Sequence, residues 1–229
     1  MTTPLPTIHA VCFDLDGLMF NTEHVFYASA EVLLQRRGHS MSRGAMDAML
    51  GRRPLESFQA LIDYLGLTEG PAELLTESRV VFHQLLETDL QPMPGLFELI
   101  DLIETVGLPK GVATSSPRDY LENVFSRFNL APRFPISLTA ESVVHGKPDP
   151  EIYLKAAEQL GVRPEEMLVL EDTQTGTRAG AAAGAFVISV PHEHTATHDF
   201  SQAGYVATGL DDPFVINLVK NARPKPAIA

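Results

Sequence analysis

From Gly95 onward the sequence alternates helical patterns with short apolar runs, and this alternation limits the possible folds more than any other feature. Strands are predicted over 111–113, 136–139, 167–170 and 185–190. Helices are predicted between and around them, beginning with a face at Leu96, Leu99, Ile100 and Ile103 and continuing over 117–129, 150–160, 173–184 and 212–220. Alternating βα units of this length form parallel sheets with helices on both faces. We therefore predict an α/β, doubly wound parallel sheet.

The first strand of this sheet is predicted far upstream, over 10–13. Between it and the break at Gln91–Gly95, the patterns predict only helices, over 23–37, about 42–50, 54–66 and from Pro71 to about 90. The chain is thus expected to form a core domain from 1–20 and 91–229, with an all-helical domain inserted over 21–90 as a lid. Gly176, Gly180 and Gly184 are spaced four apart, which predicts a helix packed closely on the sheet.

Composition excludes several classes of protein. The 229 residues are 45% hydrophobic, enough for a substantial core, and the net charge of −12 without a basic block argues against nucleic acid or an anionic membrane as partner. The single cysteine, Cys12, lies in the first apolar run and is expected to be a core residue of a protein in the reducing cytoplasm. The start of the chain lacks the pattern of a signal peptide, and no run reaches the ~18 apolar residues of a membrane span.

Polar residues follow the predicted strands where ligands bind in open parallel sheets, beyond the carboxyl ends. They are Asp14, Asp16 and Gly17; Thr114, Ser115 and Ser116; Lys147 in a loop held by two prolines; and Glu171 with Asp172. Together these carboxylates, hydroxyls and one lysine suit Mg²⁺ and a phosphoryl group. Taken singly each has an ordinary interpretation, because acids at a strand end are often solvated and Ser or Thr before Pro117 often caps a helix.

In their order along the chain, these motifs resemble those of the haloacid dehalogenase (HAD) superfamily. The matching residues are Asp14-Leu15-Asp16-Gly17, Thr114, Lys147 within GKPDP, and Glu171-Asp172. The resemblance implies a Rossmann-like core and identifies the helical insertion as a C1-type cap. Asp16 is typical of the phosphatases and phosphomutases of this superfamily, and the segments LGRRPLESFQALID, ATSS, HGKPDPEIY and LEDTQTG are similar to pseudouridine-5′-phosphatase-like and related sugar-phosphate phosphatases.

The same resemblance implies roles for individual residues in a Mg²⁺-dependent hydrolysis of a small phosphorylated metabolite. Asp14 would be the nucleophile that forms an aspartyl phosphate, and Asp16 the general acid and base. Mg²⁺ would be held by Asp14, the Asp16 carbonyl and Asp172, with Glu171 ordering a bound water. Thr114, the Ser115 N–H and Lys147 would hold the phosphoryl oxygens. Independently of the resemblance, the Gly17 turn and the Ser116 hydroxyl suit a bound phosphate. The guanidinium groups of Arg52 and Arg53 in the cap suit a carboxylate or second phosphate of the substrate, although arginines are also common on surfaces.

Some features depart from the family pattern or leave an alternative open. Asn21 stands where the family commonly has an aspartate, so we expect a changed hinge with activity kept. A β-phosphoglucomutase-like sugar phosphomutase is the first alternative, although Phe26 occupies the position of its cap histidine. A non-catalytic phosphate-sensing module, similar to a receiver domain, is the second.

Two expectations concern a histidine-containing loop and the oligomeric state. We expect His192, His194 and His198 to form a solvated loop, because magnesium does not favour imidazole. The sequence leaves the oligomeric state open, and we favour a monomer.

Overall fold

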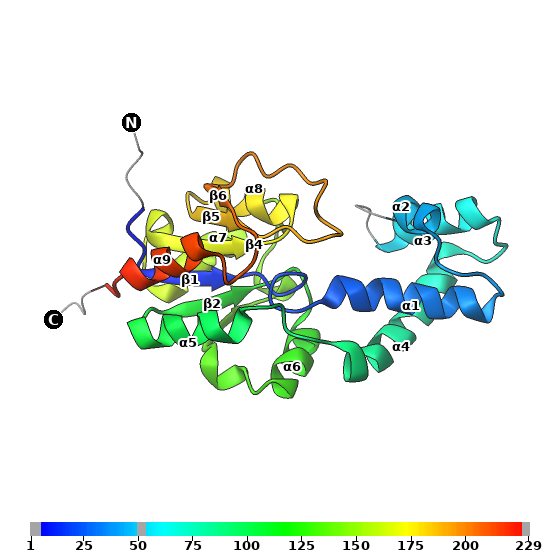
Figure 1. Cartoon of the computed structure of the whole chain (residues 1–229), viewed down its shortest axis with the longest axis horizontal. Coiled ribbons are helices and arrows are strands. Elements are labelled where there is room, and N and C mark those ends of the chain that lie inside the picture. Colours follow the sequence, from blue (N-terminus) through cyan, green and yellow to red (C-terminus); the bar gives the residue numbers. More distant parts are fainter. Residues whose placement is uncertain (1–5, 50–53, 226–229) are drawn as a thin grey trace. The chain divides into compact units, whose positions relative to one another are not determined.

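The computed structural model describes residues 6–49 and 54–225 and divides the chain into two compact units (Figure 1). The core unit holds the residues up to Met19 and from Pro92 onward, and the helical unit spans Phe20–Gln91. Arg52 and Arg53, predicted to contact substrate, lie outside the described residues.

A single parallel sheet forms the centre of the core unit. Its six strands lie in the order β3-β2-β1-β4-β5-β6, with every neighbouring pair parallel. The strands are β1 (Ala10–Phe13), β2 (Lys110–Ala113), β3 (Ile136–Leu138), β4 (Met167–Glu171), β5 (Phe186–Ser189) and β6 (Tyr205–Val206). Every residue of β1, β2 and β4 is buried, as expected for central strands that helices cover on both faces. The predicted Rossmann-like α/β fold is confirmed; β6 was not predicted.

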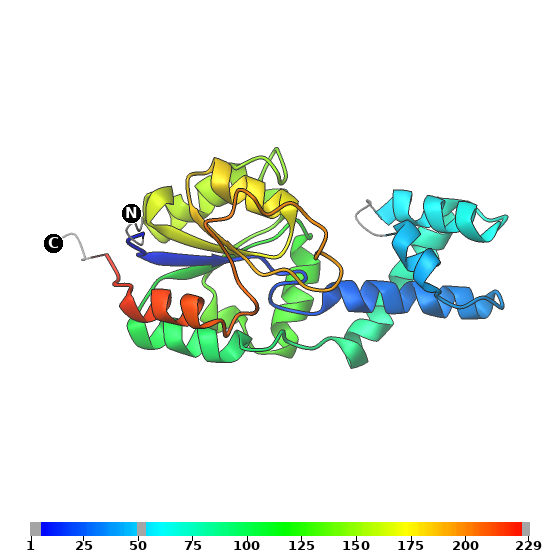
Figure 2. The ribbon, with the colours of Figure 1, turned by 45° about the horizontal axis from the view of Figure 1, so that its top comes forward.

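Helices cover both faces of this sheet (Figure 2). They are α5 (Leu96–Val106), α6 (Arg118–Arg127), α7 (Glu151–Leu160), α8 (Gln174–Ala182) and α9 (Pro213–Asn221), with short 3₁₀ turns at Ala131–Arg133, Ala140–Ser142 and Pro164–Glu166. Helices α7 and α8 pack on one face, and α5 packs beside α9 on the other. The apolar side of α7, including Ile152, Tyr153 and Ala156, joins β1 and β4 residues in one buried cluster.

The three evenly spaced glycines of this region serve different purposes. A Cβ on Gly180 would lie 2.7 Å from a methyl of Val187 and 3.2 Å from one of Val169, so α8 approaches the sheet closely there, as predicted. Gly176 also approaches the sheet closely, because a Cβ there would clash with the carboxylate of Glu171, the last residue of β4. Gly184 lies beyond the end of α8 with φ +89°, so the prediction of close packing on the sheet was wrong for this glycine.

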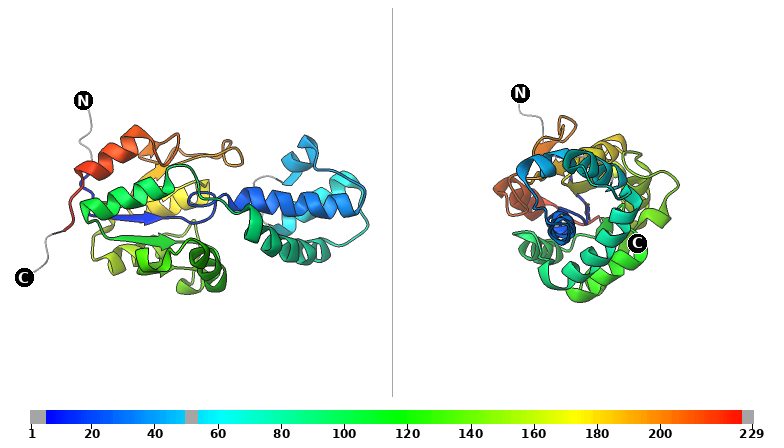
Figure 3. Two further views of the ribbon diagram at one scale, coloured as in Figure 1. Left: turned by 60° about the horizontal axis from the view of Figure 1, so that its bottom comes forward. Right: turned by 90° about the vertical axis from the view of Figure 1, so that its right-hand side faces the viewer.

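Four helices make up the described part of the helical unit: α1 (Thr22–Arg36), α2 (Arg43–Met49), α3 (Pro54–Leu65) and α4 (Pro71–Asp89). Helices α1 and α4 run antiparallel side by side (Figure 3), since Ser29 Oγ lies 2.9 Å from Ser78 Oγ while Arg36 and Arg37 pair with Glu77. Phe58, Leu61 and Leu74 belong to the apolar core of this unit.

Asn21 links the two ends of the helical unit. Its Nδ2 donates a hydrogen bond to the Asp89 carbonyl at 3.2 Å, and its Oδ1 accepts one from the Gln91 N–H at 2.7 Å. The amide uses both a donor and an acceptor here, which an ionised aspartate cannot do. Among the helices of the described ranges, none combines the length and apolar character needed to cross a membrane.

Candidate active site

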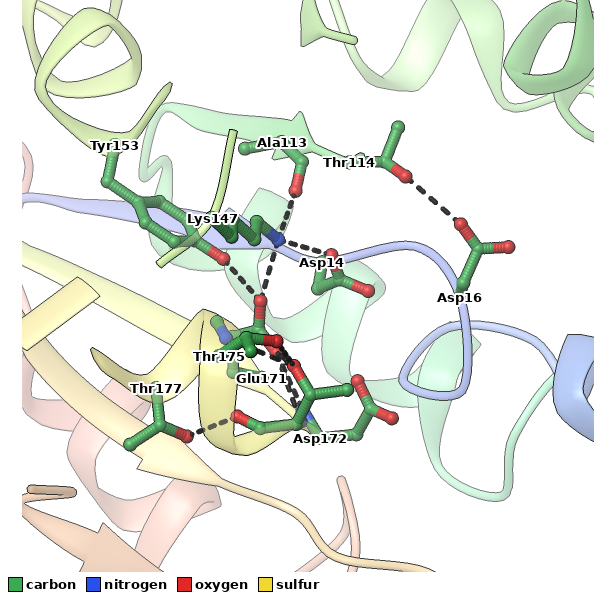
Figure 4. Close-up of polar contacts among 12 residues, drawn as sticks. Asp14, Asp16, Ala113, Thr114, Lys147, Tyr153, Glu171, Asp172, Thr175 and Thr177 are labelled. Atoms are coloured by element: carbon green, nitrogen blue, oxygen red, sulfur yellow. Dashed lines mark hydrogen bonds and ion pairs between the residues drawn. The ribbon is translucent and has the colours of Figure 1, made fainter. Parts of the chain in front are cut away.

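The carboxyl ends of three neighbouring strands deliver the predicted site residues to one edge of the sheet (Figure 4). Asp14 follows β1, Thr114 follows β2, and Asp172 follows β4 directly after Glu171, the last residue of that strand. Lys147 arrives from the loop before α7. This gathering follows from the strand order, because β1 lies between β2 and β4.

Lys147 links the residues at the centre of the site. Its Nζ donates hydrogen bonds to Asp14 Oδ1 at 2.5 Å, Glu171 Oε1 at 2.6 Å and the Ala113 carbonyl at 2.9 Å. The ammonium lies 4.9 Å from the centre of the Tyr153 ring, and the Tyr153 hydroxyl donates to Glu171 Oε1 at 2.8 Å. Only 5% of the lysine side chain is exposed, so its charge is directed inward.

Burial and neighbouring charges shift the pKa values of these groups. Burial raises the pKa of Asp14, the charges of Glu171, Asp172 and Asp16 raise it further, and Lys147 opposes them. Burial also acts to raise the pKa of Glu171, but the charge and hydrogen bond of Lys147 outweigh it and the pKa is lowered. The pKa of Lys147 is raised, since its two carboxylate partners outweigh burial. Lys147 therefore chiefly neutralises Glu171, while burial and the neighbouring carboxylates still disfavour the ionised form of Asp14.

Three buried carboxylates meet around this one lysine. Asp14, Glu171 and Asp172 each place an oxygen within 4.8 Å of the others. When all are ionised, their three negative charges exceed the single positive charge of Lys147. Oxygen ligands at this spacing, with a net negative charge, suit a small hard divalent cation such as Mg²⁺.

The carboxylate of Asp16 lies among hydroxyl groups. Its Oδ2 accepts hydrogen bonds from Thr114 Oγ1 at 3.0 Å and Ser116 Oγ at 2.7 Å, and its Oδ1 accepts one from the Tyr120 hydroxyl at 2.9 Å. The hydroxyls of Thr114 and Ser116, predicted to face phosphate, thus orient Asp16 in this structure. Ser115, between them, is exposed.

Gly17 is required by its backbone conformation and by close packing. Its φ is +80°, in the left-handed region that favours glycine. A Cβ at this position would clash with Asp172 Oδ2 and lie 2.9 Å from His192 Nε2. Cys12 is fully buried with its pKa raised to about 12 by burial, which fits a core residue rather than a nucleophile.

Sequence reasoning missed two residues of this site and misread the histidine loop. Tyr120 and Tyr153 are spaced along helices like any core aromatic, so no sequence signal distinguished them. The prediction of a solvated loop was wrong for His194, which is 8% exposed, and for His192, whose Nε2 lies 3.0 Å from Asp172 Oδ2.

The fold and the site define an α/β enzyme with a carboxylate and lysine centre at the edge of its sheet. The family model described as haloacid dehalogenase-like hydrolase matches residues 11–190, and the chain belongs to this family. The resemblance inferred from the motifs is therefore confirmed, as is the class of hydrolase.

Relatives and solved structures agree with this assignment. The chain is 32% identical to the validoxylamine A 7′-phosphate phosphatase of Streptomyces hygroscopicus subsp. limoneus, over 82% of this chain and 85% of that protein. It is 29% identical to a probable pseudouridine-5′-phosphatase of Drosophila melanogaster, over 87% and 89%. A crystal structure of a HAD family hydrolase from Deinococcus radiodurans, with bound phosphate and sodium, superposes with a TM-score of 0.76 at 26% identity, over 88% and 91%.

Proposed function

We propose that this protein is a Mg²⁺-dependent phosphatase that hydrolyses small phosphomonoesters, of the sugar-phosphate or nucleotide-like class, through an aspartyl phosphate on Asp14. The observation that carries the proposal is the buried cluster in which Asp14 and Asp172 lie beside the Lys147–Glu171 pair. Two relatives named as phosphatases support it. The reducing cytoplasm is the compartment we infer from the single buried cysteine.

The donor set fits the metal that this family implies. Asp14 and Asp172, with the backbone carbonyl of Asp16, would hold Mg²⁺, and Glu171 would order a water beside it. Glu171 itself accepts hydrogen bonds from Lys147, Tyr153 and the backbone N–H groups of Asp172 and Thr173, which fixes its position. When bound, Mg²⁺ offsets the negative charge that otherwise keeps a carboxylate away from a phosphate ester.

Chemistry begins at the carboxylate of Asp14. Because Lys147 holds Oδ1, we assign Oδ2 as the oxygen that attacks phosphorus. A bond forms from this oxygen to phosphorus, the bond from phosphorus to the ester oxygen breaks, and Asp16, which begins the cycle in its protonated form, gives its proton to the departing alkoxide. Asp16 must turn away from its three hydroxyl donors to reach that oxygen.

The second step returns the enzyme to its starting state. Water attacks phosphorus, Asp16 accepts a proton from it, and the bond to Asp14 breaks, so inorganic phosphate leaves with Asp14 again a carboxylate. Lys147, the Thr114 hydroxyl and the Ser115 N–H would neutralise and orient the phosphoryl oxygens, and the Gly17 turn offers a further N–H. The helical unit would act as a lid that excludes water and selects the substrate, with Asn21 at its hinge.

The test measures free phosphate released from a panel of sugar phosphates, polyol phosphates, nucleotides and pseudouridine phosphate by purified protein with Mg²⁺. We expect turnover of at least one class and its loss in Asp14→Asn. A matched control, Glu158→Gln, removes an exposed carboxylate on α7 and should keep wild-type turnover.

Three outcomes would contradict the proposal. Equal turnover by Asp14→Asn would remove Asp14 as nucleophile. Conversion of one sugar-phosphate isomer to another without phosphate release would favour the mutase, and binding of an ester with no turnover would favour the sensing module.

A further inference from the structure

The loop after β5 brings a histidine to the buried end of β4. His192 Nε2 lies 3.0 Å from Oδ2 of Asp172, a residue with no exposed surface. The sheet explains this contact, because β5 pairs with β4 up to Ser189 opposite Glu171, and the Val190 N–H continues the ladder to the Glu171 carbonyl. His192 then follows two residues later, beside Asp172.

The backbone of the loop assigns the tautomer of this ring. The His194 N–H donates a hydrogen bond to His192 Nδ1 at 3.3 Å. A ring nitrogen that accepts a hydrogen bond carries no proton, so the neutral ring carries its proton on Nε2. His192 therefore donates a hydrogen bond to Asp172 Oδ2.

The ring is also held in place by its own turn. The His192 N–H donates to Thr195 Oγ1 at 3.0 Å, and the Thr195 N–H donates back to the His192 carbonyl at 3.0 Å. Thr195 has no exposed surface. Gly17 packs directly against this pair of side chains, since a Cβ at this position would clash with both the Asp172 carboxylate and the His192 imidazole.

From this geometry we propose that His192 is a positioning residue that sets the orientation of the Asp172 carboxylate for a divalent cation. A hydrogen bond to one oxygen fixes rotation about the Cβ–Cγ bond and thereby the place of both oxygens. The proposal rests on the proposed function for its metal. Groups that orient metal-binding side chains in this way typically account for ~10–100-fold in metal affinity.

Binding of Mg²⁺ to the full, chelator-treated chain, followed by isothermal titration calorimetry, tests the proposal without any turnover. His192→Leu removes the donor, and we expect it to weaken Mg²⁺ binding ~10–100-fold. His192→Gln places an amide N–H the same number of bonds from the backbone as Nε2 and should bind within a few-fold of wild type. Thr197→Ala, an exposed change in the same loop, should bind as wild type.

The outcomes separate this inference from the proposed function. Wild-type affinity in His192→Leu, or equal weakening in the Leu and Gln variants, would overturn it even if phosphatase activity is present. Mg²⁺ binding that depends on His192 in a protein without phosphatase activity would support it while the proposed function fails. If His192→Leu does not fold, as judged by circular dichroism, His192→Met takes its place with the same expectation.

Discussion

Neutralising Asp172 should stabilise the metal-free protein while removing its response to Mg²⁺. The variant Asp172→Asn keeps the size of the side chain and an oxygen that accepts from His192, so it changes mainly the charge. The negative charges of Asp172 and Glu171 already contribute to the raised pKa of Asp14, which shows that this cluster is repulsive without a cation.

The magnitude follows from the spacing of the carboxylates. At 4.8 Å, two unit charges repel by about 3.5 kcal/mol in an effective dielectric constant of about 20. Asp172 has two such neighbours, Asp14 and Glu171, but its loss also removes attraction to Lys147 and weakens the hydrogen bond from His192. We therefore expect a net gain of about 1–3 kcal/mol in the free energy of unfolding in EDTA, with Tm higher by roughly 2–4 °C per kcal/mol.

Mg²⁺ should reverse the order of the two proteins. A cation at 1,000 times its dissociation constant stabilises the wild type by about 4.1 kcal/mol, more than the gain of the variant in EDTA, whereas the variant lacks a ligand and should change little. Differential scanning calorimetry in EDTA and in a Mg²⁺ series measures both effects, and it separates transitions if the two units unfold apart.

A control variant that removes one negative charge elsewhere tests whether the effect is specific to the site. Glu158→Gln, which is exposed, should follow the wild type in both conditions. The reasoning is refuted if Asp172→Asn is less stable than the wild type in EDTA and if Mg²⁺ raises its stability as much as it raises that of the wild type.

Two further predictions concern the backbone that supports the site. The pKa of Glu151 is lowered from 4.5 to about 2 by Lys155 and by the N–H groups of His145 and Val144, which lie in the loop that carries Lys147. Because the pKa is lower in the folded protein than in the unfolded chain, ionised Glu151 stabilises the fold above pH 4.5. This contribution is lost as the pH falls toward 2. Glu151→Gln should therefore lower the urea midpoint at pH 7, by an amount that shrinks as pH falls below 4.5; a difference that grows toward acid would contradict the assignment. Gly17→Ala forces a side chain onto a φ of +80° and onto the metal-ligand candidate beside it, so Mg²⁺ affinity should fall at least ~10-fold by calorimetry, and wild-type affinity would show that the turn has room.

The sequence predicted most elements of the fold because their patterns are local. Buried runs such as 10–13 and 167–170 contain little besides apolar residues, and glycines or prolines mark most helix ends. Strand β6 escaped prediction because it has only two residues, Tyr205 and Val206, and neither is buried. It pairs at the edge of a sheet already formed by stronger strands, so tertiary context rather than its own pattern makes it a strand.

The candidate site was predictable where strand ends carry it and unpredictable where a loop or helix does. Asp14, Thr114 and Asp172 follow their strands at once, so the topology alone brings them together. His192 was misread because imidazole was considered only as a metal ligand, although it also serves as a neutral hydrogen-bond donor to a carboxylate. Tyr120 reaches Asp16 from α6, and only the packing of that helix reveals the contact.

The charges at the sheet edge fall into three groups that explain why a divalent cation suits the site. Lys147 pairs with both Glu171 and Asp14, and the lowered pKa of Glu171 beside the raised pKa of Asp14 assigns its neutralising effect chiefly to Glu171. Asp16 is held apart by three hydroxyl donors. Asp14 and Asp172 remain, two buried carboxylates whose combined charge a divalent cation offsets. In the proposed enzyme, the repulsion that weakens the metal-free fold would be the same interaction that creates affinity for the metal, so a substitution that relieves one should reduce the other.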